Sequence, residues 1–204
     1  MANGPTLDEH RQAETVGSSL EQEYRALTDG VGLLDQSHVG RLSVSGEDAL
    51  DLLNRLSTNE LTTIEVGEMV PTVLTSNKGR ILDLLFVLRL EGRLLVLTDP
   101  ENRQKVIDWL DFYTIMEDVS VQDTTEDTAM VSLVGPRAAG LLDGLTGGKA
   151  GSLDLYWSAE ATIGGVQATI VRADFVRLPG YDLVVAGDEV EQLANEVVDQ
   201  GVAF

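Results

Sequence analysis

Two cationic side chains flank a glycine at Lys78-Gly79-Arg80, between two apolar runs that alternate in the way that strands do. A tight turn with two cations and a flexible backbone suits an anionic group, such as a carboxylate tail or a phosphate. The residues do not follow the G-x-x-x-x-G-K order of a nucleotide-binding loop. The alternative is a plain hairpin with solvated ends, and the sequence supports both interpretations equally.

The other side chains limit the chemistry that the chain can carry. It has no cysteine, which excludes disulfides, thiolate zinc sites, cysteine-bound iron–sulfur clusters and thiol catalysis within it. Its two histidines, His10 and His38, are too few for a histidine metal site, so we expect no bound metal. Carboxylates are spread so widely that spacing alone identifies no Ser-His-Asp set.

The charge of the chain is strongly negative, with 34 acidic residues against 14 lysines and arginines and a net charge of −20. Because the acids are dispersed rather than collected in a tail, they predict a surface suited to high salt. A halophilic host, and a fold that gains stability as salt is added, would follow. The alternative is an acidic protein from an ordinary host. Either way nucleic-acid binding is disfavoured, since it depends on clustered lysines and arginines.

The N-terminal segment and the apolar runs bear on location. Residues 1–19 are polar and acidic with no apolar signal region, which predicts a mobile acidic arm. No apolar run approaches the length needed to span a membrane. We therefore expect a cytoplasmic protein without a membrane partner.

Apolar periodicity predicts the elements that must position the candidate side chains. Strands are predicted at residues 39–44, 70–75, 80–90, 93–97 and 119–122, and again at 129–134, 161–163, 166–172 and 181–186. Helices are predicted at residues 20–27 and 188–199, and after a Ser45/Asp48 capping box, after Asp99-Pro100 and after Gly135-Pro136.

The second half of the chain repeats the first at a shift of 89 positions, with apolar residues, glycines and helix-start aspartates in register. Coinciding pairs include Leu42 with Val131, Gly46 with Gly135 and Asp99 with Asp188. The alternative is chance similarity between two units that obey the same patterning. We interpret the pattern as a duplication, hence an α+β fold of two pseudo-repeated βαβββα units with mainly antiparallel sheets.

The repeat sets the expected domains: the arm at residues 1–19, a first unit at 20–125 and a second at 126–204. The second unit is incomplete in this scheme, because the counterpart of strand 119–122 would lie beyond Phe204. A bare sheet edge, or an uncovered apolar face of helix 188–199, would recruit a partner. We therefore expect self-association, or a separate polypeptide that supplies a missing C-terminal part.

Several segments, taken in order, resemble the aminomethyltransferase superfamily, which contains the glycine-cleavage T-protein and the YgfZ-type folate-binding proteins. They are DQSHVG at residues 35–40, NEL at 59–61, NKGRILD at 77–83, LVGPRA at 133–138 and RADFVRLPGYDL at 172–183. The resemblance covers the chain from about residue 33 to its end, without the family's C-terminal part. It implies tetrahydrofolate as a ligand or cosubstrate.

The resemblance also implies which residues contact the folate. Asp182, with Tyr181 beside it, stands where T-proteins place the acid that grips the pterin ring, and a carboxylate can accept from an amino group and a ring N–H together. Lys78 and Arg80 would hold the glutamate tail, and His38 and Asn59 would line the site. The alternatives are a solvated strand residue for Asp182, a structural histidine for His38 and a helix-terminating residue for Asn59.

The resemblance leaves the catalytic residue unknown. The position that matches the family's essential carboxylate is Leu84, which can neither accept a proton nor stabilise positive charge. Asp83 is a weak candidate, because neighbouring strand residues point to opposite faces.

Three functions follow from this comparison of residues. The first is a folate-binding protein with a YgfZ-like role that does not perform T-protein chemistry. The alternative is an aminomethyltransferase of glycine cleavage that moves a one-carbon unit from a lipoyl-bound donor to tetrahydrofolate. The third is a non-catalytic partner subunit.

Overall fold

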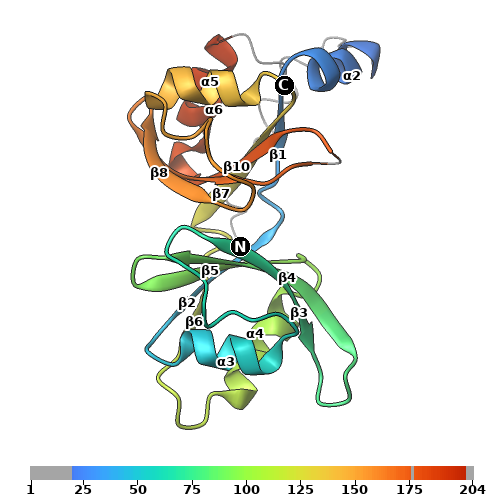
Figure 1. Cartoon of the computed structure of the whole chain (residues 1–204), viewed down its shortest axis with the longest axis vertical. Coiled ribbons are helices and arrows are strands. Elements are labelled where there is room, and N and C mark those ends of the chain that lie inside the picture. Colours follow the sequence, from blue (N-terminus) through green and yellow to red (C-terminus); the bar gives the residue numbers. More distant parts are fainter. Residues whose placement is uncertain (1–19, 176, 201–204) are drawn as a thin grey trace. The chain divides into compact units, whose positions relative to one another are not determined.

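The computed structural model describes residues 20–175 and 177–200. The chain divides into two compact units (Figure 1). One, here called the central unit, is the continuous segment His38–Thr125, and the other, the split unit, combines the residues up to Ser37 with those from Glu126 onwards. The predicted arm, residues 1–19, lies outside the described residues.

The central unit is built on a five-stranded sheet with the strand order β3-β4-β5-β2-β6. Its neighbouring strands are antiparallel. Alternate strand residues, such as Leu85 and Val96, pack with two helices into one core, because one face of each strand is apolar. The strands are β2 (Gly40–Ser45), β3 (Met69–Thr75), β4 (Ile81–Leu90), β5 (Arg93–Thr98) and β6 (Ser120–Asp123), and the helices are α3 (Ala49–Leu56) and α4 (Arg103–Tyr113).

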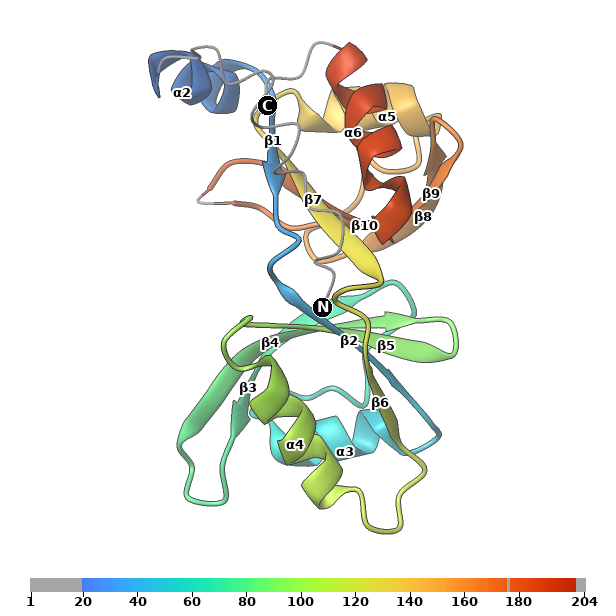
Figure 2. The same ribbon diagram turned by 180° about the vertical axis from the view of Figure 1, so that it is seen from behind.

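The split unit is built on a second antiparallel sheet of five strands, with the order β1-β7-β10-β9-β8. Its core lies between one face of this sheet and the helices α5 and α6 (Figure 2). The strands are β1 (Gly32–Asp35), β7 (Thr128–Val134), β8 (Ser158–Ile163), β9 (Val166–Arg172) and β10 (Gly180–Ala186), and the helices are α2 (Leu20–Asp29), α5 (Ala138–Thr146), the short 3-10 helix η1 (Gly187–Glu189) and α6 (Val190–Asp199).

The predicted duplication is confirmed at the level of fold. The order β2-α3-β3-β4-β5-α4 recurs as β7-α5-β8-β9-β10-α6, which is the expected βαβββα unit in two copies. Each copy builds its own sheet and its own apolar core. The α+β class with mainly antiparallel sheets is therefore as the sequence predicted.

The expectation of an uncovered edge in the second copy has to be corrected. In the central unit β6 lies beside β2, and in the split unit β1 takes the same place beside β7, the counterpart of β2. The missing fifth strand is thus supplied from upstream of the repeat, which is why residues 20–37 lie in the split unit rather than with residues 38–125. The apolar face of α6 is buried within its own chain.

Two helix starts also differ from the prediction. The side chain of Asp48 makes no capping hydrogen bond to α3; its carboxylate instead accepts the backbone N–H of Asp118 at 2.8 Å. Helix α4 begins at Arg103, because Asp99-Pro100 opens a turn that is closed by the Asn102 N–H donating to the Asp99 carbonyl at 3.0 Å. Both departures come from tertiary contacts that a local pattern does not contain.

A buried arginine ties together the two ends of the central unit. Arg41 is 0% exposed, and its guanidinium donates to the carbonyl of Val39 at 2.6 Å and to that of Thr125 at 2.5 Å. Val39 precedes β2 and Thr125 follows β6, so one side chain holds the segments by which the chain enters and leaves this unit.

None of the helices in the described ranges is long and apolar enough to cross a membrane.

Candidate functional site

Asp182 lies on β10, the central strand of the split-unit sheet. Its neighbours Tyr181 and Leu183 are part of the core, so the alternation of the strand directs Asp182 to the opposite face, away from α5 and α6. Its Oδ1 accepts a hydrogen bond from the Ser132 hydroxyl at 2.5 Å. Among the described residues, Ser132 is the only hydrogen-bond partner of this carboxylate. A carboxylate offers about four acceptor positions, and three of them remain for a ligand.

The protonation of Asp182 is unusual for an aspartate. Burial raises the pKa of Asp182 to about 6, and the hydrogen bond from Ser132 opposes this shift. The carboxyl group is therefore mostly ionised at neutral pH, when it can accept two N–H groups at once. Of the candidates, this group has the geometry and the charge that recognition of a planar N–H edge requires.

Tyr181 does not join Asp182 in a common site. Its ring is buried in the core of the split unit, and its hydroxyl donates to the carbonyl of Gly151 at 3.1 Å. Because adjacent strand residues point to opposite faces, a ligand on Asp182 would lie on the far side of the sheet from this ring. Tyr181 anchors the loop at Gly151, and its contact with a ligand stays a prediction from the sequence.

The turn at residues 76–80 presents its two cations to solvent. Lys78 and Arg80 are both exposed. The turn is closed by Ser76, which accepts from the N–H of Gly79 at 2.8 Å and donates its own N–H to the Arg80 carbonyl at 2.8 Å. Gly79 has a φ of +68°, which a glycine adopts without steric cost. The hairpin is as predicted, and its role in binding a glutamate tail stays a proposal.

His38 and Asn59 take different local roles. His38 is exposed, at the start of the central unit. The amide nitrogen of the Asn59 side chain donates to the Pro71 carbonyl at 2.7 Å, and its backbone N–H donates to the Thr72 hydroxyl at 3.1 Å. Asn59 therefore fastens the segment after α3 to strand β3, which matches the structural alternative for this residue.

The two candidates for the catalytic position lie on opposite faces of β4, as predicted. Asp83 is 6% exposed on the core side, and Leu84 is 51% exposed on the other side. The Asp83 carboxylate accepts from the Thr98 hydroxyl, from the Asp99 N–H at 3.0 Å and from the Asn102 amide at 3.1 Å. These three donors make Asp83 the anchor of the turn that leads into α4.

The candidates are divided between the units. Asp182 and Tyr181 belong to the split unit, and the other four folate-binding candidates, with Asp83 and Leu84, belong to the central unit. Within the split unit the structure pairs Asp182 with Ser132, a residue that the sequence did not single out. The signal was present: Ser132 is a lone hydroxyl inside an otherwise apolar strand interior, AMVSLV.

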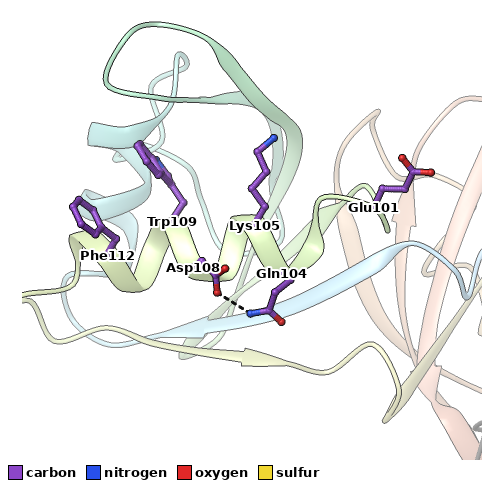
Figure 3. A pocket seen from close by; sticks show the side chains of 6 residues that line it. All are labelled: Glu101, Gln104, Lys105, Asp108, Trp109 and Phe112. Carbon is purple, nitrogen blue, oxygen red and sulfur yellow. Dashed lines mark hydrogen bonds between the residues drawn. The ribbon is translucent and has the colours of Figure 1, made fainter.

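A hollow with a volume of about 540 Å³ lies along α4. Figure 3 shows its six side chains, with Lys105 and Trp109 extending to the same side of the helix. Lys105 donates to the Leu82 carbonyl at 3.0 Å, and Gln104 donates to Asp108 at 2.8 Å, so most of its polar groups are already engaged. It contains none of the candidates above. Over the described ranges, no cluster of three or more His, Asp or Glu side chains is arranged to hold a metal ion.

Comparisons with known proteins identify the family of the chain. The family model of the GCVT N-terminal domain matches residues 7–204. The aminomethyltransferase of Bacillus subtilis (strain 168) is 29% identical over 189 residues, which are 92% of this chain and 52% of the relative. The aminomethyltransferase of Streptomyces avermitilis is 32% identical over 184 residues, or 90% of this chain and 50% of the relative. The chain thus spans about half the length of these curated relatives.

Solved structures show the same fold. The glycine cleavage system aminomethyltransferase T of Bartonella henselae superposes with a TM-score of 0.79 at 21% identity, covering 90% of this chain and 49% of that one. A chain of the heterotetrameric sarcosine oxidase of Corynebacterium sp. U-96 superposes with a TM-score of 0.65 at 15% identity, covering 88% of this chain and 89% of that one. By its sequence match and its fold, the chain belongs to the aminomethyltransferase family, in the part described as the GCVT N-terminal domain.

Proposed function

We propose that the chain binds tetrahydrofolate as the acceptor of a one-carbon unit in an aminomethyltransferase. The observation that carries the proposal is Asp182, a largely ionised carboxylate fixed on one oxygen by Ser132, with acceptor positions left on the face of the sheet away from α5 and α6. The amino group and a ring N–H of a pterin form a planar pair of donors that matches such an acceptor.

The names of the relatives favour the transfer reaction over a purely binding role. The curated relatives at 26–32% identity are aminomethyltransferases, and so is the structure with a TM-score of 0.79. In that reaction a lipoyl-bound aminomethyl group would be the donor and tetrahydrofolate the acceptor. The partners would then be folate and a lipoyl-bearing carrier.

A YgfZ-like role, in which folate is bound without transfer, is the second candidate. It is favoured by one observation, the pair Asp83 and Leu84. Leu84 offers no carboxylate on the exposed face, and Asp83 is committed to three donors around the turn before α4. Transfer would require an acid elsewhere, because an apolar side chain cannot move a proton.

Association with a further polypeptide is part of the proposal. The relatives are about twice as long, and the similar chain in the sarcosine oxidase belongs to a heterotetramer. The reason first expected for association, an uncovered α6, does not apply. Three of the exposed apolar side chains among the described residues, Phe112, Ile115 and Met116, lie close together in sequence, at the end of α4 and in the loop after it. This association, like a cytoplasmic location and a preference for high salt, stays a proposal.

The proposal is tested by titrating the chain with 5-formyltetrahydrofolate and, separately, with p-aminobenzoylglutamate, which has the tail but no pterin. We expect saturable heat with the first ligand and at least about tenfold weaker binding of the second, because the pterin contacts are charge-assisted. Turnover with a lipoylated aminomethyl carrier then separates the transferase from the YgfZ-like role. Equal affinity for both ligands would contradict pterin recognition.

A further inference from the structure

Strand β7 carries one polar residue in its interior, and that residue is buried. Ser132 is 4% exposed, between Val131 and Leu133, which belong to the core. Alternation places the Ser132 side chain on the other face of the sheet, the face of Asp182. A buried hydroxyl is costly unless it is hydrogen-bonded. The cost of burying the Ser132 hydroxyl is therefore offset only if a residue on a neighbouring strand accepts its hydrogen bond.

The partner is set by a change of register between the two repeats. In the central unit Ser43 of β2 lies opposite Leu95 of β5. At the 89-residue shift an unchanged pairing would place Ser132 opposite Val184. The strands β7 and β10 are displaced by two residues from that pairing, so that Ser132 lies opposite Asp182. A displacement by two keeps every side chain on its own face and changes only which residues meet.

The contact constrains how the carboxylate can be used. The Ser132 hydroxyl donates to Oδ1 at 2.5 Å, a length typical of a charge-assisted O–H···O⁻ hydrogen bond. It occupies one acceptor position on Oδ1 and opposes rotation of the carboxylate about its terminal bond. Each oxygen still has a free acceptor position, which a planar pair of N–H donors needs. The residues on the outer neighbours of these two strands are apolar: Val171 of β9 pairs with Asp182, and Leu34 of β1 pairs with Ser132.

We propose that Ser132 is a positioning residue, whose hydrogen bond to Oδ1 orients the Asp182 carboxylate to receive two N–H groups of a pterin edge. The proposal rests on the proposed function for the identity of the ligand. The orientation of Asp182 by Ser132 does not, and it is measurable without any ligand.

The test compares Ser132→Ala with Ser43→Ala, which removes the equivalent serine of the other repeat. Ser132→Ala should weaken binding of 5-formyltetrahydrofolate at least about tenfold at about pH 7.5, whereas Ser43→Ala should leave it unchanged. The loss should grow as the pH falls towards 6, because the hydrogen bond from Ser132 holds the pKa of Asp182 down. Ser132→Cys, nearly isosteric with a weak donor, should lie between the two.

A second readout separates this proposal from the proposed function. Carboxyl ¹³C NMR should show that Asp182 titrates at higher pH in Ser132→Ala than in the unsubstituted chain, with Ser43→Ala unchanged. If the chain binds no folate but the titration moves, the function is wrong and the orientation by Ser132 stands. If the Asp182 titration is the same in all variants, or if Ser132→Ala binds as tightly as Ser43→Ala, the positioning role is overturned. Should Ser132→Ala not fold, Ser132→Cys supplies both readouts.

Discussion

Arg41→Ala is expected to destabilise the central unit by about 3–5 kcal/mol. The guanidinium is fully buried and donates to the carbonyls of Val39 and Thr125, at 2.6 and 2.5 Å. Each hydrogen bond from a charged donor contributes roughly 1.5–3 kcal/mol, and its loss leaves a buried carbonyl unpaired. The two segments that close the unit would be released together, and Arg41→Lys should recover only part of the loss, because an ammonium lacks the planar fork.

The two tryptophans allow this to be measured unit by unit, since Trp109 lies in the central unit and Trp157 in the split unit. In a Trp157→Phe background, fluorescence during urea unfolding reports the central unit through Trp109. Arg93→Ala, which removes an exposed arginine from β5 of the same sheet, is the control and should change stability by no more than about 0.5 kcal/mol. Equal free energies of unfolding for Arg41→Ala and Arg93→Ala would refute the role given to Arg41.

Asp182→Asn is expected to stabilise the split unit at neutral pH and to have little effect on its stability near pH 4. The pKa of Asp182 is about 6 in the folded chain, against 3.8 for an aspartate exposed to water. Between these values the folded state holds a proton that the unfolded state has lost, so the stability of the natural chain falls as the pH rises through this window. Above it the penalty is constant, on the order of 2–3 kcal/mol. Asparagine keeps the acceptor for Ser132 and removes the ionisation.

The matching measurement uses a Trp109→Phe background, in which Trp157 reports the split unit. The difference in unfolding free energy between Asp182→Asn and the aspartate chain should open between about pH 4 and pH 6 and stay level above it. Taking the difference cancels the titration of the other acids. A difference that is constant across this range would mean that burial does not raise the proton affinity of Asp182.

The repeat and the strand pattern were predictable from sequence because they depend on local periodicity. The shift of 89 positions aligned two copies of the same βαβββα order, and the opposite orientation of Asp83 and Leu84 followed from strand geometry alone. The predictions that failed concern contacts between residues far apart in the sequence. Strand β1 pairs with β7, whose residues lie about 100 positions further along the chain, and the local sequence at residues 32–35 does not predict this pairing.

In the candidate site, too, the features that depend on local sequence were predictable and those that depend on distant contacts were not. Asp182 was found from the motif around it, whereas the packing of the Tyr181 ring in the core and its hydrogen bond to Gly151 are evident only from the fold. Ser132 was missed because its role depends on a two-residue displacement between β7 and β10. Comparison of the two repeats in sequence would pair Ser132 with Val184 rather than with Asp182. Asp83 was a weak candidate from its place on the strand, and only the fold reveals the three donors that engage it.

The central claim, that Asp182 receives the pterin of a bound folate, is tested most directly by calorimetric titration of two variants with 5-formyltetrahydrofolate. Asp182→Ala removes the proposed acceptor, and Asp188→Ala removes the same charge from an exposed position in the same unit. Loss of a charge-assisted contact costs about 1.5–3 kcal/mol, so we predict at least about tenfold weaker binding for Asp182→Ala and unchanged binding for Asp188→Ala. Equal affinity of both variants and the unsubstituted chain would contradict the account.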